Sequence, residues 1–282
     1  MSDSSFSLFT SLRYDVSLQQ VPDSRLHYAG WNYHNQSPLY MLDLHRDRIL
    51  KAATHWQWKG AVEKLSGDVA LDQLARMAQE AVGSSPEPKP LRLRIVVNSK
   101  GDMTFQHFDT PPLPLENLLP QRLPEPGAPP GPNEPKVPPR FTLAVDDDPT
   151  PRSEFTHFKT TKRAMYDAAR QRAGIGPQDQ KEVLIVNAHD KSVMEGSTTT
   201  PYFWRNGRWV TPPVSPTFSW EDGCGGQDGT SRRWALQRGL AVEQAVPVDS
   251  LVDGEECWIS SGVSGFRLAV VSLKRPAQAS VG

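Results

Sequence analysis

The sequence predicts an α+β protein built from two halves that a proline-rich segment joins. Both halves mix amphipathic stretches of helical period with short runs of alternating or β-branched residues. Twelve of the 26 prolines gather in residues 111–139. Because proline fixes φ and lacks a backbone donor, we expect this segment to be neither a helix nor a central strand. The predicted domains are therefore residues 1–110 and 140–282, and residues 111–139 form an extended interdomain segment or, alternatively, a ligand for an SH3 or WW module.

The first half contains two predicted helices and two predicted strands. Apolar residues at helical spacing place one helix around His45, within residues 39–58, and a second helix over 71–82. Residues 91–97 alternate in polarity and end in β-branched residues, and a turn leads from them into a second strand over 104–108. This half is expected to be a small α+β domain.

The second half is richer in strands. An Asn-Gly pair at positions 206 and 207 is a strong signal for a tight turn, so residues 200–213 are predicted to form a hairpin. The other predicted elements are helices over 160–173 and 231–240 and strands over 183–187 and 257–262.

The composition excludes several classes of protein. The chain has 282 residues, a net charge of −1 and an isoelectric point of about 6.7, so it lacks the broad basic surface that binds nucleic acid or anionic lipid. No apolar run approaches the roughly 18–20 residues of a membrane span, and residues 1–15 show no secretory signal. Cys224 and Cys257 are the only cysteines, which fits a reducing compartment. We expect a cytoplasmic protein.

A glycine-rich segment over 223–233 could bind an anion. It leads into the predicted helix over 231–240, so the first backbone N–H groups of that helix could hold a phosphate, and Thr230 and Ser231 add hydroxyl groups. The segment lacks the Gly-Lys-Ser/Thr of a P-loop. A surface turn without a ligand is the alternative.

Two lysines and one glutamate are further candidates. Lys159 follows aromatic residues that could desolvate its amine and favour the neutral, reactive form, but Lys162 has an equal claim and either could be a solvated lysine. Glu195 is predicted in a small-residue turn, where it could pair with a bound ring or only line the turn. The histidines have no cysteines at a metal-binding spacing, so we expect no metal site.

Short segments of the chain, taken in order, resemble the fold-type IV pyridoxal-phosphate enzymes. The match runs from about Phe9 to Ala269, and its segments are FTSLRYD, LHRDRI, HFKTTKR, MEGSTTTPYFW, GGQDGTSRR and ECWISSGVSGFR. This family contains branched-chain aminotransferases, D-amino-acid aminotransferases and 4-amino-4-deoxychorismate lyases. The resemblance implies a two-domain α+β fold, pyridoxal 5′-phosphate as the cofactor and a homodimer.

The resemblance also implies roles for individual residues. It selects Lys159 over Lys162 as the lysine that carries the cofactor and moves the substrate proton, and it pairs Glu195 with the pyridine nitrogen. Arg48 corresponds to the arginine that binds the cofactor phosphate. Four hydroxyl-bearing residues are implied near that phosphate: Thr230, Ser231, Ser260 and Ser261.

Within the family, HFKTTKRAMYDAAR and RLRIVVNSKGDM are most similar to fungal aminodeoxychorismate lyases. The implied reaction converts 4-amino-4-deoxychorismate to p-aminobenzoate and pyruvate in folate biosynthesis. Arg94 and Arg13 are candidates, by position, for binding the two carboxylates of this substrate. A class IV aminotransferase acting on branched-chain or D-amino acids is the alternative, since it begins with the same Lys159 step.

Overall fold

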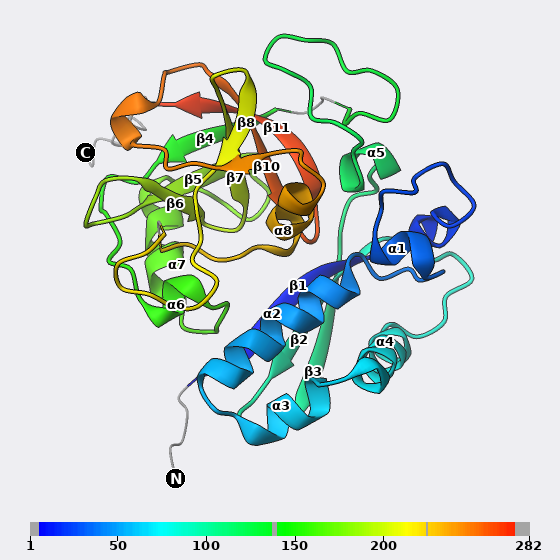
Figure 1. The fold of residues 1–282 in the computed structure, drawn as a ribbon. Helices are drawn as coiled ribbons and strands as arrows, with labels where there is room; N and C mark the ends of the chain where they lie inside the picture. Colours follow the sequence, from blue (N-terminus) through cyan, green and yellow to red (C-terminus); the bar gives the residue numbers. More distant parts are fainter. Residues whose placement is uncertain (1–5, 137–139, 224, 274–282) are drawn as a thin grey trace, which may run out of the picture.

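A computed structural model describes residues 6–136, 140–223 and 225–273 and contains two β-sheets of different size (Figure 1). Residues 137–139 of the predicted interdomain segment and Cys224 of the glycine-rich segment lie outside the described residues. No helix in the described part of the chain is both long enough and apolar enough to cross a bilayer.

The smaller sheet has three antiparallel strands in the order β1 (Leu8–Tyr14), β2 (Leu91–Val97) and β3 (Met103–Asp109). Its neighbouring helices are α1 (Trp31–His34), α2 (Leu42–His55), α3 (Lys59–Leu65) and α4 (Asp68–Val82). Alternation along β2 sends Leu93, Ile95 and Val97 into the core with α2, α3 and α4, and it turns Arg92 and Arg94 to the opposite face. That helix-free face is polar and contributes to the candidate site.

The larger sheet has eight strands in the order β6-β5-β4-β11-β10-β7-β8-β9. Their bounds are β4 (Phe141–Val145), β5 (Lys181–Val186), β6 (Val193–Gly196), β7 (Thr200–Arg205), β8 (Arg208–Thr211), β9 (Val242–Glu243), β10 (Glu256–Ser261) and β11 (Gly265–Ser272). The helices of this part are α6 (Glu154–His157), α7 (Ala164–Arg172) and α8 (Thr230–Gln237). Strand β4 runs parallel to β5 and β11, and the hairpin of β7 and β8 turns at the predicted Asn-Gly pair.

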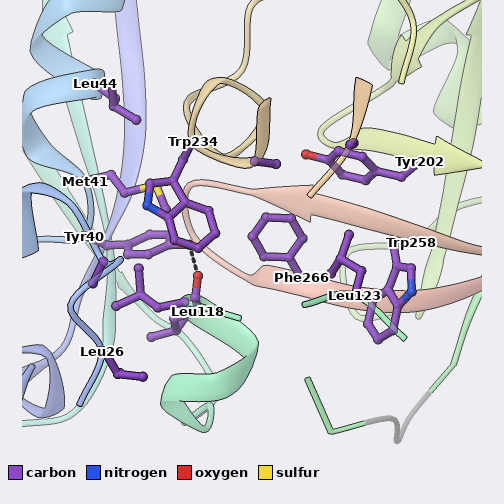
Figure 2. Close-up of a cluster of buried hydrophobic side chains, with 14 of the residues drawn as sticks. Leu26, Tyr40, Met41, Leu44, Leu118, Leu123, Tyr202, Trp234, Trp258 and Phe266 are labelled. Carbon is purple, nitrogen blue, oxygen red and sulfur yellow. Dashed lines mark hydrogen bonds between the residues drawn. The ribbon is translucent and has the colours of Figure 1, made fainter. Parts of the chain in front are cut away.

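A cluster of buried apolar side chains joins the two parts of the molecule (Figure 2). Tyr40 and Met41 precede α2, Leu118 lies in a short helix, Trp234 lies in α8 and Phe266 lies in β11. The Tyr40 hydroxyl donates a hydrogen bond to the Leu118 carbonyl. Burial of each large apolar side chain contributes roughly 1.5–3 kcal/mol. The cluster therefore holds α2 against α8, the two helices that carry one end of the candidate site.

The proline-rich segment is not wholly extended, which corrects the sequence prediction. Helix α5 (Leu115–Leu118) forms between Pro114 and Pro120, where five consecutive residues are free of proline. The segment is also tied to the larger sheet, because the indole N–H groups of Trp209 and Trp258 donate to backbone carbonyls of residues 123 and 124 at 3.2 Å each.

Two further predictions were wrong at the site itself. The predicted helix over 160–173 begins only at Ala164, because the preceding residues pair with β1: the Phe9 N–H donates to the Lys159 carbonyl at 3.1 Å, and the Thr161 N–H donates to the Ser7 carbonyl at 2.9 Å. Glu195 lies within strand β6, paired with β5, rather than in a turn.

Candidate active site

Lys159 lies where the two parts of the molecule meet. Its backbone carbonyl accepts a hydrogen bond from the Phe9 N–H of β1, and its Nζ lies 5.0 Å from the centre of the Phe9 ring. Burial lowers the pKa of Lys159 well below its ordinary value, and the charges of Arg48 and Arg163 lower it further, whereas Glu195 opposes the shift. The neutral amine is therefore favoured, as a nucleophile or a proton acceptor requires.

Lys162, three residues further on, has a different environment. It is exposed, and its Nζ lies over the rings of Phe6 and Phe155 at 5.4 and 4.8 Å. The sequence alone gave the two lysines equal claims, but only Lys159 faces a buried carboxylate.

Glu195 is that carboxylate. Its side chain is 8% exposed, and the Tyr166 hydroxyl donates to its Oε1 at 2.5 Å. Gln227 donates in turn to the Tyr166 hydroxyl oxygen at 3.1 Å. Burial raises the pKa of Glu195 to about 7, although the hydrogen bond from Tyr166 and the charge of Lys159 act in the opposite direction. A buried acid of this kind stabilises a neighbouring cation, such as a protonated ring nitrogen.

Arg48 belongs to a hydrogen-bonded group at the other end of the site. It donates to the Thr10 hydroxyl, which lies 2.6 Å from Nδ1 of the buried His45, and Nε2 of His45 lies 3.3 Å from the Thr230 hydroxyl. The Nε atom of Arg48 is buried and has no hydrogen-bond partner in the described chain. Burial lowers the pKa of Arg48 to about 10, a value at which the guanidinium is still charged at neutral pH.

Ser231 and Ser260 extend this group of hydroxyls. The Ser260 hydroxyl donates to the Ser231 hydroxyl at 2.8 Å and lies 2.9 Å from the Tyr202 hydroxyl, and both serines are buried. Ser231 lies in the first turn of α8, whose N-cap residue supplies no side-chain hydrogen bond, so the first N–H groups of α8 are not capped by a side chain. Ser261 instead accepts hydrogen bonds from the N–H groups of residues 263 and 264 and supports the β10–β11 turn.

The two arginines proposed for the substrate differ in placement. Arg94 lies on the helix-free face of the smaller sheet, with its guanidinium carbon 4.5 Å from the centre of the Phe9 ring. Arg13 is fully buried and donates to Asp15 at 2.8 Å, to the Pro111 carbonyl at 2.8 Å and to the Val263 carbonyl at 3.4 Å. These internal contacts disfavour the prediction that Arg13 binds substrate.

Several site residues escaped the sequence analysis. His45 was considered only as a metal ligand, and Thr10, Tyr166 and Gln227 lie in segments that carry the resemblance but were given no role. His45 does stand three residues before Arg48, on the same face of α2, and that spacing was an available signal. The contacts of Tyr166 with Glu195 and Gln227 cross 29 and 61 residues of sequence, so local pattern could not reveal them.

The chain is similar to known proteins of one family. A model of the class IV amino-transferases matches residues 28–270. An aminodeoxychorismate lyase of Saccharomyces cerevisiae is 32% identical over 150 residues, which cover 48% of this chain and 38% of the yeast protein. The aligned part is therefore well under half of the length of that relative.

Solved structures share the fold at low sequence identity. An amino-acid aminotransferase described as putative, from Mesorhizobium loti, has a TM-score of 0.64 at 19% identity and covers 94% of this chain and 99% of its own. A 4-amino-4-deoxychorismate lyase from Pseudomonas aeruginosa has a TM-score of 0.55 at 14% identity, covering 95% and 84%. A hypothetical aminotransferase from Mycobacterium tuberculosis, in a form with α-ketoglutarate and PMP bound, has a TM-score of 0.56 at 16% identity, covering 99% and 87%. These likenesses confirm the predicted fold class.

Proposed function

This chain belongs to the class IV amino-transferase family, and from that premise we propose that it is a pyridoxal-phosphate-dependent lyase that converts 4-amino-4-deoxychorismate to p-aminobenzoate and pyruvate. The observation that carries the proposal is the pairing of Lys159, whose pKa is lowered, with the buried Glu195. The similarity to the yeast lyase supports the lyase over an aminotransferase.

The side chains of the site fit this cofactor. The buried Nε of Arg48 lacks a partner in the described chain, and it lies near hydroxyl groups and the uncapped start of α8, a donor set suited to a phosphate dianion. Arg48, Thr230, Ser231 and Ser260 would hold the phosphate, and Glu195 would accept a hydrogen bond from the pyridine nitrogen. When bound, pyridoxal phosphate supplies an electron sink for the carbon next to the substrate amine.

Lys159 has two tasks in this scheme. It would hold the cofactor in the resting protein, and its neutral Nζ would accept the proton from the substrate carbon that bears the amine. The bond between the ring and the enolpyruvyl oxygen breaks, and the departing enolpyruvate takes up a proton to become pyruvate. The ring becomes aromatic, which drives the reaction toward p-aminobenzoate.

Glu195 and its neighbours keep the site in the state that this proton transfer needs. Its carboxylate keeps the ring nitrogen protonated, and Tyr166, supported by Gln227, fixes the orientation of the carboxylate. Arg94 offers its guanidinium to a substrate carboxylate at the mouth of the site. We further propose, from the resemblance, a cytoplasmic homodimer that serves folate synthesis; sedimentation analysis of the purified chain tests the dimer.

The proposal is tested by incubating cofactor-loaded protein with freshly prepared aminodeoxychorismate and measuring p-aminobenzoate and pyruvate. We expect both products in equal amounts. If neither forms, and an amino donor instead converts the cofactor to its amine form that a 2-oxo acid reverses, the protein is an aminotransferase and the lyase assignment is wrong.

A further inference from the structure

Three cationic side chains surround the ring of Phe9. The guanidinium carbon of Arg94 lies 4.5 Å from the ring centre, Nζ of Lys159 lies 5.0 Å away and the guanidinium carbon of Arg163 lies 6.0 Å away. They come from β2, from the segment that pairs with β1 and from the residue that precedes α7. The fold therefore gathers two guanidinium groups around one aromatic ring, beside the amine of the reactive lysine.

Arg94 has little compensation for its charge. No carboxylate of the described residues forms an ion pair with it, its Nε is buried without a partner, and its one side-chain hydrogen bond goes to the neutral Gln106 at 3.3 Å. Burial lowers the pKa of Arg94, and the positive charges of Arg92 and Arg163 lower it further. An anion at this position would relieve that repulsion.

Arg163 is only weakly compensated. Its acidic neighbour Asp167 lies 3.7 Å away, and the Asp167 side chain is 67% exposed, so solvent screens the pair. The Nη2 atom of Arg163 donates to the Ser197 carbonyl at 3.1 Å, which fixes the guanidinium near the Tyr166 ring, 4.9 Å away. Arg163 is thus held in place, with the exposed Asp167 as its ion-pair partner among the described residues and the charge of the buried Glu195 acting on it without an ion-pair contact.

Three other arginines of the chain have more acceptors around their guanidinium groups. Arg232 is paired with Asp228 and Glu243, and Arg172 makes two hydrogen bonds to Asp146 at 2.8 and 2.7 Å. Arg13, the alternative substrate residue, is fully buried and bonds three internal acceptors, one of them the carboxylate of Asp15. Arg94 and Arg163 therefore differ from these three arginines in how little their charge is compensated.

We propose that Arg163 acts with Arg94 as a carboxylate-binding pair around Phe9 and that this pair selects amines carrying two carboxylate groups. The inference rests on the proposed function, because it assumes that the substrate amine reaches Lys159. It assigns to Arg163 a specificity role that the sequence motifs did not indicate and replaces Arg13 as the partner of Arg94. A guanidinium presents paired donors that match a carboxylate.

Calorimetric titration of the cofactor-loaded protein tests the pair with two probes, 4-aminobenzene-1,3-dicarboxylate and its uncharged diamide. The wild type should bind the dicarboxylate more tightly. A lost charge-assisted hydrogen bond weakens binding by about tenfold or more. Arg163→Gln and Arg94→Gln should therefore each weaken binding of the dicarboxylate by that factor and leave binding of the diamide unchanged. Arg163→Lys, which keeps the charge, should recover part of the affinity.

Two control variants separate recognition from structure. Arg92 lies on the same face of β2 and stacks on Phe108 at 4.5 Å, and Arg170 contacts Ser197 from the next turns of α7. Arg92→Gln and Arg170→Gln should bind the dicarboxylate as the wild type does. Equal dicarboxylate binding by wild type and Arg163→Gln, or no preference of the wild type for the dicarboxylate over the diamide, would overturn the inference.

The lyase assay distinguishes a failure of the carboxylate pair from a failure of the proposed reaction. An arginine-dependent preference for the dicarboxylate in a protein that forms no p-aminobenzoate would keep the carboxylate pair and remove the proposed reaction. If the protein has lyase activity but both arginine variants bind the dicarboxylate as the wild type does, the proposed reaction stands and the carboxylate pair is wrong.

Discussion

The two ends of the candidate site are built in opposite ways. At the Arg48 end, side chains from β1, α2 and α8 form a continuous set of hydrogen bonds through Thr10, His45 and Thr230, and Ser260 of β10 bonds Ser231 of α8 beside it. At the Phe9 end, the guanidinium groups of Arg94 and Arg163 lie near an aromatic ring with few acceptors. The first end is held rigidly by its own contacts, whereas the second carries charge that the described chain neutralises only in part.

This difference fits two kinds of ligand group. A cofactor phosphate stays in place through many turnovers, so preorganised donors suit it. A substrate carboxylate arrives and leaves in each turnover, so exposed charge that draws and orients an anion suits it better. Lys159 stands between the two ends, and its charge is influenced by both Arg48 and Arg163.

Replacing Lys159 should have the largest effect on turnover, because the ligand groups bound at both ends act at its amine. We expect Lys159→Ala to lower turnover by about 10³-fold or more, since the proton acceptor is lost. Lys162→Ala is the matched control and should keep full turnover, because Lys162 is exposed and faces Phe6 and Phe155. Turnover of Lys159→Ala at the wild-type rate would remove the catalytic assignment.

Replacing Arg48 tests the rigid end. Arg48→Gln should weaken pyridoxal phosphate binding by about 10- to 100-fold through the loss of a charge-assisted contact, measured by fluorescence titration of the cofactor-free protein. Arg46→Gln on the same helix is the control, since Arg46 bonds the carbonyls of Leu65 and Gly67. If Arg48→Gln and Arg46→Gln bind pyridoxal phosphate with the same affinity, Arg48 does not hold the phosphate and the contrast between the two ends is wrong.

Gly262 tests how tightly the rigid end is packed. A Cβ at this position would lie 2.5 Å from Cε1 of the buried His45 and 2.8 Å from the Thr230 hydroxyl. We therefore expect Gly262→Ala to lower the free energy of unfolding by about 1–3 kcal/mol. Gly176→Ala, whose Cβ would meet its nearest atoms at 3.7 Å, should change stability little in the same urea titration. Equal free energies of unfolding for the two variants would show that the packing around Gly262 relaxes, which would contradict the rigidity of this end.

The pH dependence of stability tests the burial of Glu195, between the two ends. Its pKa is about 7 in the folded protein against an ordinary 4.5, so the folded state keeps a proton that the unfolded chain releases. Stability from this group is fully present below about pH 4.5 and is lost as the pH rises through about 7. Glu195→Gln should therefore gain stability over the wild type by roughly 1–2 kcal/mol between those values.

This gain is measured by urea unfolding of the cofactor-free proteins between pH 4.5 and 8. A difference between Glu195→Gln and wild type that is the same at every pH in this series would contradict the shifted titration of Glu195.

The sequence predicted the regular elements better than the site. Helix α2, strand β2 and the hairpin at the Asn-Gly pair follow from local periodicity and turn chemistry, and the structure has them where expected. The helix predicted from residue 160 begins at Ala164 because pairing with β1 outweighs helix propensity. Local pattern could not foresee that competition, since β1 lies about 150 residues earlier along the chain.

For the candidate site, family resemblance contributed what residue patterns left open. Residue type and neighbours did not separate Lys159 from Lys162, whereas the resemblance did. Neither revealed Thr10, Tyr166 or Arg163, because their contacts with Arg48, Glu195 and Phe9 exist only after the chain has folded. The same is true of Arg13, whose burial and hydrogen bonds to internal acceptors are properties of the folded structure alone.

The attachment point of the cofactor tests the central claim most directly. Borohydride reduction of the protein loaded with pyridoxal phosphate would fix the cofactor to the amine that holds it, and mass spectrometry of the proteolytic peptides would locate it. We expect a single modification on Lys159 and none on Lys162. Modification of Lys162, or no modification of the 157–163 segment, would contradict it.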